Sequence, residues 1–214
     1  MKQSIVTLDL EGVLTPEIWI AVAKKTGIEE LRQTTRDEPD YDKLMRKRLA
    51  ILKRNGIKIS DIHHVISALR PLDGARRFLD ELRSLAPVVI LSGTFEEFAA
   101  PLLRQLGWPT LLCHRLNIED GQIVDYRLRI PEHKKEAVMA FWKMNYSVVA
   151  VGDSYNDIDM LLAANTGIFF QAPESLRKQF QQFRAVDSYV DLMALIKDTI
   201  HENQKSHPPQ LDLR

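Results

Sequence analysis

Four short apolar runs, separated by amphipathic helical patterns, constrain the fold of this chain more than any other feature. The runs lie at residues 4–10, 87–93, 147–154 and 166–170. The helical patterns between them lie at residues 73–85, 95–107 and 134–144. Strands that alternate with helices predict an α/β fold, here a Rossmann-like, doubly wound parallel sheet with helices on both faces.

Three of the apolar runs end in polar side chains beside a glycine. Asp9 and Glu11 precede Gly12, Ser92 precedes Gly93, and Asp153 follows Gly152. In parallel sheets the carboxyl ends of neighbouring strands meet at one edge, and ligands bind beyond that edge. Residues two apart in an extended chain point to the same side, so we expect Asp9 and Glu11 to face one substrate.

These residue types suit phosphoryl transfer. Two carboxylates with separated pKa values supply a nucleophile and a general acid. Asp153 adds a third negative charge, which requires a cation, and an all-oxygen ligand set favours Mg²⁺. Ser92, the main-chain amides after it and a lysine would bind the remaining phosphate oxygens. The pattern predicts transfer through an aspartyl-phosphate.

The segment between the first two apolar runs has no strand signal. It contains three helical patterns, with Gly27 and Gly56 as predicted helix ends. We predict a small helical cap inserted after the first strand, and a hairpin over residues 114–129. The predicted boundaries are 1–15 and 72–200 for the α/β core, 16–71 for the cap and 201–214 for a flexible tail.

Four ordered motifs resemble those of the haloacid dehalogenase superfamily of phosphohydrolases. They are "DLEGVL", "LSGTF", Lys134 in "HKKEAV", and "GDSYND". Within the superfamily the chain resembles the phosphoserine phosphatases, and most of all a branch described as phosphoserine phosphatase/homoserine phosphotransferase. That branch has the same Asp-Leu-Glu-Gly opening. The resemblance implies Mg²⁺-dependent hydrolysis of O-phospho-L-serine through an aspartyl-phosphate, and leaves additional transfer to homoserine open.

The resemblance also implies a role for each matched residue. Asp9 would be the nucleophile and Glu11 the general acid/base. The phosphate-binding residues would be Ser92, Gly93, Lys134 and Asn156, with Lys135 as an alternative to Lys134. The Mg²⁺ ligands would be Asp9, Glu11 through its main-chain carbonyl, Asp153, and Asp157 through water.

Two cap residues match positions that bind the non-reacting part of phosphoserine. Arg48, in "LMRKRLAIL", would bind the substrate carboxylate, for which a guanidinium is well shaped. Glu17 would meet the substrate ammonium group. Glu11 departs from the family pattern, which usually has Asp at that position.

Composition excludes several classes of partner. Twenty-nine basic residues balance twenty-nine acidic ones, so no basic field favours nucleic acid. Apolar stretches are too short for a membrane span, and the single cysteine, Cys113, is typical of a reducing compartment. We expect a cytoplasmic protein that acts on a small molecule, with its oligomeric state and its balance of hydrolysis and transfer undetermined by sequence. The alternatives are a phosphatase for another small phosphorylated metabolite, and a non-enzymatic receiver module phosphorylated on aspartate.

Overall fold

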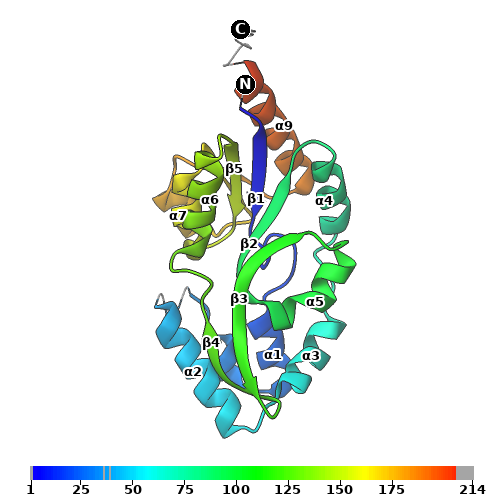
Figure 1. Ribbon diagram of the computed structural model, residues 1–214, viewed down its shortest axis with the longest axis vertical. Coiled ribbons are helices and arrows are strands. Elements are labelled where there is room, and N and C mark those ends of the chain that lie inside the picture. Colours follow the sequence, from blue (N-terminus) through cyan, green and yellow to red (C-terminus); the bar gives the residue numbers. More distant parts are fainter. Residues whose placement is uncertain (1, 36, 39, 206–214) are drawn as a thin grey trace.

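A seven-stranded sheet forms the centre of the computed structural model, which describes residues 2–35, 37–38 and 40–205 (Figure 1). The strand order is β4-β3-β2-β1-β5-β6-β7, and every neighbouring pair is parallel except β3 with β4. The strands are β1 Ser4–Leu8, β2 Val88–Phe95, β3 Thr110–Glu119, β4 Gln122–Arg127, β5 Ser147–Gly152, β6 Thr166–Phe170 and β7 Arg184–Val186. The predicted α/β fold with a mostly parallel sheet is confirmed.

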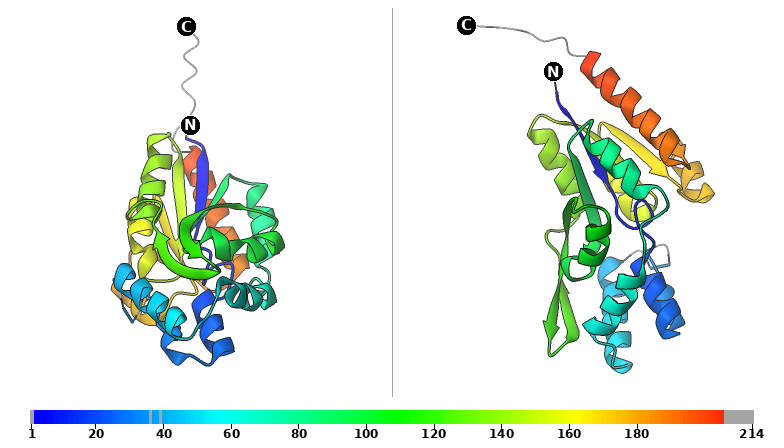
Figure 2. Two further views of the ribbon diagram at one scale, coloured as in Figure 1. Left: turned by 60° about the horizontal axis from the view of Figure 1, so that its bottom comes forward. Right: turned by 90° about the vertical axis from the view of Figure 1, so that its right-hand side faces the viewer.

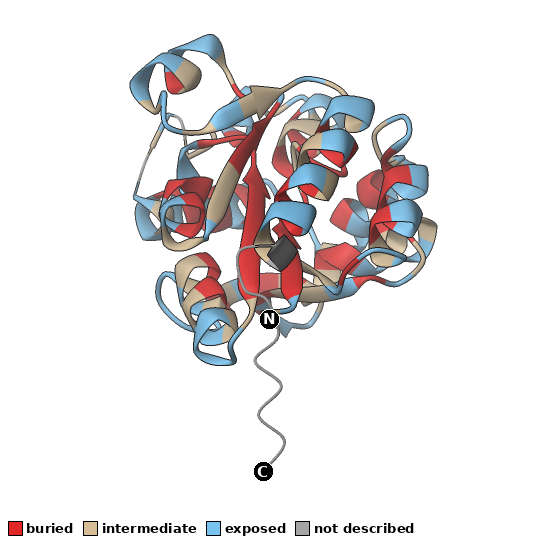
Figure 3. Ribbon diagram, turned by 90° about the horizontal axis from the view of Figure 1, so that it is seen from above, coloured by how far each residue is buried: buried red, intermediate tan, exposed pale blue. Residues whose placement is uncertain are grey.

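Helices cover both faces of this sheet (Figure 2). One face packs against α4 (Ala75–Arg83) and α9 (Tyr189–Lys205), the other against α6 (His133–Lys143) and α7 (Ile158–Ala163). Side chains of β1 alternate between the two apolar clusters, because Val6 and Leu8 contact the first and Ile5 the second. Figure 3 shows the consequence: the strands are buried and the outer faces of the helices are exposed. Two further helices complete the core, α5 Glu96–Gln105 and α8 Glu174–Gln179.

Strand order reverses between β1 and β5, which places the candidate site. The chain adds β2 and β3 on one side of β1, and β5, β6 and β7 on the other. A crevice opens at the carboxyl ends of the strands where the order reverses in this way. Asp9 follows β1 and Asp153 follows β5, and the main-chain N–H of Asp9 donates to the Val151 carbonyl at 3.0 Å. The two aspartates are therefore delivered to the same crevice.

The cap helices lie beyond the carboxyl ends of β1 and β2, at the bottom of Figure 1. They are α1 Ile18–Thr26, η1 Glu29–Arg32, α2 Tyr41–Arg54 and α3 Ile59–Ala68. As expected, α1 ends next to Gly27, and α2 ends at Arg54, two residues before Gly56. Their apolar residues share one cluster with Phe95 and Phe98 at the start of α5 and with the β3–β4 hairpin. The hairpin therefore packs against the cap helices, which lie far before it in the sequence.

Helix α9 corrects one expectation. The flexible tail predicted for residues 201–214 cannot begin at 201, because α9 continues through Lys205. Leu192, Ile196 and Ile200 repeat at helical spacing and are buried against the sheet, which stabilises the last turns. Residues 206–214 lie outside the described part of the chain. Within the described part, no helix has the length and apolar character needed to cross a membrane.

Candidate active site

Asp9 and Lys134 form a buried ion pair at the carboxyl end of β1. The Lys134 Nζ lies 2.9 Å from Asp9 Oδ1 and 2.7 Å from Asp157 Oδ1. Burial raises the pKa of Asp9 to about 7, and the Asp157 charge adds to this effect while Lys134 opposes it. Burial alone would lower the pKa of Lys134, but the Asp157 and Asp9 carboxylates outweigh it and hold that pKa above its ordinary value. Lys134 is therefore a permanent positive charge in the site.

The neighbouring lysine points elsewhere. Lys135 is partly exposed and pairs with Glu132, with 3.1 Å between Nζ and Oε2. Successive residues of a helix differ in direction by about 100°, so only one of two adjacent lysines reaches the sheet. Of the two candidates, the geometry assigns Lys134 to the site.

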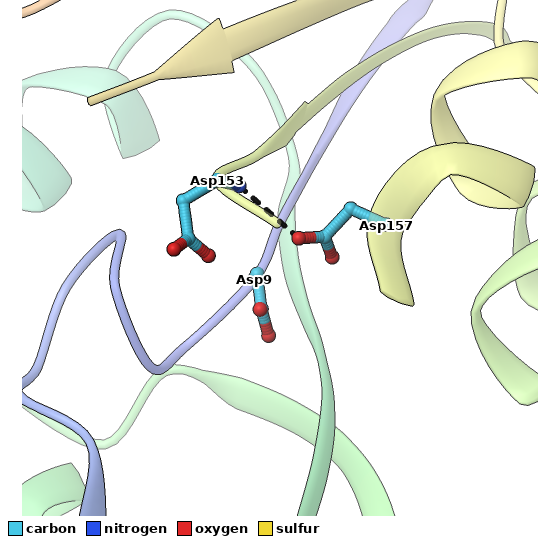
Figure 4. Close-up of side chains that lie close together, drawn as sticks. All are labelled: Asp9, Asp153 and Asp157. Atoms are coloured by element: carbon cyan, nitrogen blue, oxygen red, sulfur yellow. Dashed lines mark hydrogen bonds between the residues drawn. The ribbon is translucent and has the colours of Figure 1, made fainter. Parts of the chain in front are cut away.

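Asp157 shapes the loop that follows β5. Its Oδ2 accepts a hydrogen bond from the main-chain N–H of Asp153 at 3.1 Å (Figure 4). It accepts a second from the main-chain N–H of Ser154, also at 3.1 Å. A β-carbon at Gly152 would lie only 2.4 Å from the Asp157 side chain, so glycine is required there for this approach. Both oxygens of Asp157 are engaged, one by Lys134 and one by the loop.

Asp9, Asp153 and Asp157 form the acidic group that is suited to a metal ion. All three are buried, and one carboxylate oxygen from each lies within 4.8 Å of the others (Figure 4). Burial raises the pKa of Asp153 to about 8, with further contributions from Asp157 and Asp9. One ammonium group cannot balance three carboxylates, and a hard divalent cation with oxygen ligands would complete the balance. The donor set fits Mg²⁺.

Glu11 lies apart from this acidic group because the cap holds its carboxyl group. Its Oε2 accepts a hydrogen bond from the main-chain N–H of Ile18, the first residue of α1, at 2.8 Å. Gly12 next to it has φ +82°, and a β-carbon there would meet the Asp153 carboxylate at 2.4 Å. Burial raises the pKa of Glu11 to about 8, and the charge of Glu17 adds to the shift. Glu11 thus retains a proton at neutral pH, as a general acid must.

A single cavity collects most of the predicted binding residues. Its lining contains Asp9, Glu11, Glu17, Arg48, Ser92, Gly93 and Asn156. Ser92 is fully buried in the second half of β2, and its Oγ accepts a hydrogen bond from the Thr94 N–H at 3.2 Å. Asn156 is exposed, and its Oδ1 accepts from the Ser154 hydroxyl. The cavity therefore runs from Asp9 and the second half of β2 to the cap, and its lining does not include Lys134, Asp153 or Asp157.

Arg48 projects from α2 into the cap side of the cavity. Its guanidinium stacks 4.5 Å from the centre of the Trp19 ring, and Nη2 donates to the Gln33 carbonyl at 2.8 Å. Its Nε is buried and has no hydrogen-bond partner within the described ranges. Burial lowers the pKa of Arg48 to about 10, which still leaves the group charged at neutral pH. A buried cation with an unused donor suits an anionic ligand group.

Several cavity residues escaped the sequence analysis. The cavity lining also includes Trp19, Thr34, Thr35, Tyr41, Thr94 and Ser154. Tyr41 precedes Arg48 by two helical turns, so both lie on the same face of α2. That spacing could have identified Tyr41 from the sequence. No local pattern distinguishes Trp19 or the two threonines, because the packing of the cap helices brings them in.

Comparison with known proteins identifies the family. The family model for haloacid dehalogenase-like hydrolases matches residues 4–165. The chain belongs to the haloacid dehalogenase-like hydrolases. A Pseudomonas aeruginosa protein named phosphoserine phosphatase ThrH is 57% identical over 189 residues, which cover 88% of this hydrolase and 92% of that protein. A Pseudomonas syringae pv. tomato protein named phosphoserine phosphatase is 56% identical, with 88% and 80% covered.

Solved structures agree with this membership in fold. A substrate-bound phosphoserine phosphatase complex matches the hydrolase with a TM-score of 0.75 at 24% identity, covering 92% of this chain and 98% of that one. A phospho-aspartyl intermediate analogue of phosphoserine phosphatase matches with a TM-score of 0.71 at 22% identity, covering 84% and 91%. At these identities the likeness establishes the α/β architecture.

Lys134 is expected to stabilise the folded hydrolase as well as its site. In metal-free buffer, Lys134→Met would leave the Asp9 and Asp157 carboxylates buried without their counter-charge, and should lower the free energy of unfolding by about 3–5 kcal/mol. Lys135→Met, which removes only a partly exposed ion pair with Glu132, should change the free energy of unfolding by no more than about 0.5 kcal/mol. Urea denaturation of the two variants measures the difference. Equal losses of stability would contradict the assignment of Lys134 to the buried cluster.

Proposed function

We propose that this hydrolase removes phosphate from O-phospho-L-serine, with Asp9 as the nucleophile. The observation that carries the proposal is the division of one cavity into two charged ends. At one end Asp9, which belongs to the acidic group, and Ser92 suit the phosphoryl group, and at the other Arg48 with Glu17 suits a carboxylate and an ammonium group. A phosphorylated amino acid presents these three groups together. The names of both Pseudomonas relatives support the same substrate.

In the first step an Asp9 oxygen attacks phosphorus. Lys134 and the Leu10 N–H, at 2.9 and 2.7 Å, both bind Oδ1 of Asp9, which leaves Oδ2 as the attacking atom. A bond forms between Oδ2 and phosphorus while the bond from phosphorus to the serine oxygen breaks. Glu11 gives its proton to that departing oxygen, which its raised pKa allows.

In the second step water attacks the phosphorus of the aspartyl-phosphate. Glu11, now ionised, takes a proton from the water, and the bond from phosphorus to Asp9 breaks to release inorganic phosphate. Lys134 and the Ser92 hydroxyl neutralise charge on the phosphoryl oxygens throughout. Asp9 returns to its starting state, so the cycle is balanced.

The acidic group fits Mg²⁺ in this proposal. Asp9, Asp153 and the main-chain carbonyl of Glu11 would hold the ion, with Asp157 contributing through water. When bound, Mg²⁺ would offset the negative charge of the carboxylates and the phosphoryl group. The engagement of both Asp157 oxygens by Lys134 and the Asp153 loop supports an indirect role for that residue.

The two alternative functions are not equally compatible with the family of this chain. Membership of a hydrolase family argues against a receiver module without enzymatic activity. A phosphatase for another small phosphorylated metabolite would keep the acidic group and differ at the cap, so a substrate panel separates it from the proposal. A cytoplasmic location remains an expectation that rests on the composition of the chain.

Asp9→Asn should reduce phosphate release from phosphoserine to background in the presence of Mg²⁺. The amide keeps the shape of the side chain but lacks the nucleophilic oxygen. Wild type should also lose activity when a chelator removes Mg²⁺. Asp159→Asn, which changes an exposed aspartate of α7, serves as the matched control and should retain full activity. Turnover by Asp9→Asn within about tenfold of wild type would rule out the aspartyl-phosphate.

Arg48→Ala should raise KM for phosphoserine by about 30- to 150-fold, because a charge-assisted contact is worth roughly 2–3 kcal/mol. Phosphoethanolamine lacks the carboxylate and should be almost unaffected. Arg46→Ala removes an exposed arginine of the same helix, paired with Asp125, and should leave both substrates unchanged. Steady-state kinetics on the two substrates provide the measurement. Equal losses on both would assign Arg48 a structural role.

We also propose homoserine as a second acceptor for the phosphoryl group. The bond from Glu11 to the Ile18 amide ties its carboxyl group to the cap and limits its reach toward an attacking water. A slow second step lengthens the life of the aspartyl-phosphate, and an alcohol in the cavity can then intercept it. This is the specific observation that favours transfer.

Glu11→Asp should therefore shift the products toward hydrolysis. The shorter side chain cannot maintain the Ile18 bond in the same position, and a displacement on the order of 1 Å can change a rate about a hundredfold. Phosphohomoserine and free phosphate are measured in parallel for wild type and variant. An unchanged product ratio in an active, folded variant would leave acceptor choice to the cap.

A further inference from the structure

Tyr41, the first residue of α2, connects the cap helices to the end of β2. Its hydroxyl donates a hydrogen bond to the Gly93 carbonyl at 2.8 Å. Its ring meets the rings of His114 and Tyr126 edge-on, with 5.9 Å between centroids in each case. Burial raises the pKa of the phenol, so the hydroxyl keeps the proton that it donates. The ring is fixed by packing and the hydroxyl by one directional bond.

That bond acts on a peptide unit of the phosphate end of the cavity. The described chain has no cis peptide bonds, so the unit between Gly93 and Thr94 is trans and planar. Its carbonyl and its N–H consequently point in opposite directions. The carbonyl accepts from Tyr41, and the N–H of Thr94 donates to Ser92 Oγ at 3.2 Å. Tyr41 and Ser92 therefore hold the two sides of one peptide plane.

The hydrogen bond from Thr94 to Ser92 determines which hydrogen-bonding capacity of the Ser92 hydroxyl remains for a ligand. A serine hydroxyl has one proton to donate and lone pairs that accept. The Thr94 N–H occupies the acceptor side of Oγ, and no residue of the described ranges accepts the Ser92 proton. Ser92 is fully buried and lines the same cavity as Asp9. Its proton is thus available to a ligand oxygen in that cavity.

We propose that Tyr41 is a positioning residue for phosphoryl binding, acting through the Gly93–Thr94 peptide on the Ser92 hydroxyl. The inference rests on the proposed function in one respect, that the cavity holds a phosphoryl group beside Ser92. Phosphate binding at this end of the cavity then depends on Tyr41, a cap residue that need not contact phosphate itself. Arg48, on the same helix, serves the other end of the substrate.

If Tyr41 only stabilised the packing of the cap, its aromatic ring would be sufficient. Tyr41→Phe keeps that ring and removes only the hydroxyl. Tyr126→Phe is the matched control, because its ring packs in the same cluster and its hydroxyl bonds to Asp42 in α2 instead of to strand β2. Each variant loses one partly buried hydrogen bond, so similar losses of stability are expected in urea denaturation.

Binding of inorganic phosphate in the presence of Mg²⁺, measured by calorimetry, tests the proposal directly. Tyr41→Phe should weaken phosphate binding about three- to tenfold, the value of one oriented hydrogen bond, while Tyr126→Phe stays at the wild-type Kd. The kcat/KM values of Tyr41→Phe for phosphoserine and phosphoethanolamine should fall by equal factors, because both share the phosphoryl group.

The outcomes separate this inference from the proposed function. A wild-type Kd for phosphate in Tyr41→Phe, equal weakening in Tyr126→Phe, or no phosphate binding by wild type would each overturn the role of Tyr41. Selective loss of phosphate binding in Tyr41→Phe, with no turnover of phosphoserine by wild type, would support the role and reject the substrate. A loss on phosphoserine alone would place Tyr41 with Arg48 at the carboxylate end instead.

Discussion

The ammonium group of Lys134 lies between the carboxylates of Asp9 and Asp157, and the arrangement of the whole crevice depends on this contact. A buried carboxylate without a counter-charge lowers the stability of a protein by several kcal/mol, so separating the three groups would destabilise the fold. Lys134 comes from α6, Asp9 from the end of β1, and Asp157 from the short 3-10 helix at Tyr155–Asp157 that follows β5. The contact fixes these three segments relative to one another. With Asp153 added, the negative charge exceeds the positive charge. That excess of negative charge makes this edge of the sheet suited to a cation.

Bringing carboxylates so close to main chain requires positions without side chains. At Gly12 the free space is taken by the Asp153 carboxylate, and at Gly152 by the Asp157 side chain. Each glycine thus leaves room for an acidic side chain of the site, which any other residue at that position would displace. The segments "DLEGVL" and "GDSYND" are constrained in their glycines by packing and in their acids by charge.

The core of the site could be predicted from the sequence because strand ends carry it. Asp9 and Asp153 follow apolar runs, and parallel strands bring their carboxyl ends to one edge. The choice between Lys134 and Lys135 could not be predicted, because it depends on how α6 is rotated against the sheet. The bond from Glu11 to α1 also depends on tertiary packing and leaves no local pattern. The same holds for the β3–β4 hairpin, whose turn was evident but whose contact with the cap helices was not.

The chain enters the cap helices near Leu14 and leaves them near Leu72, and the Leu72 N–H donates to the Leu14 carbonyl at 2.9 Å. Two connections joined at one point are the geometry of a single hinge. Yet the apolar surface of the cap helices is completed by Leu116, Ile123 and Tyr126, which the chain supplies only after β2 and α5. An exchange of the inserted helices alone would leave the apolar side chains of the hairpin without the partners they pack against. A change of the cap helices would therefore have to be matched by a change in the β3–β4 hairpin that packs against them.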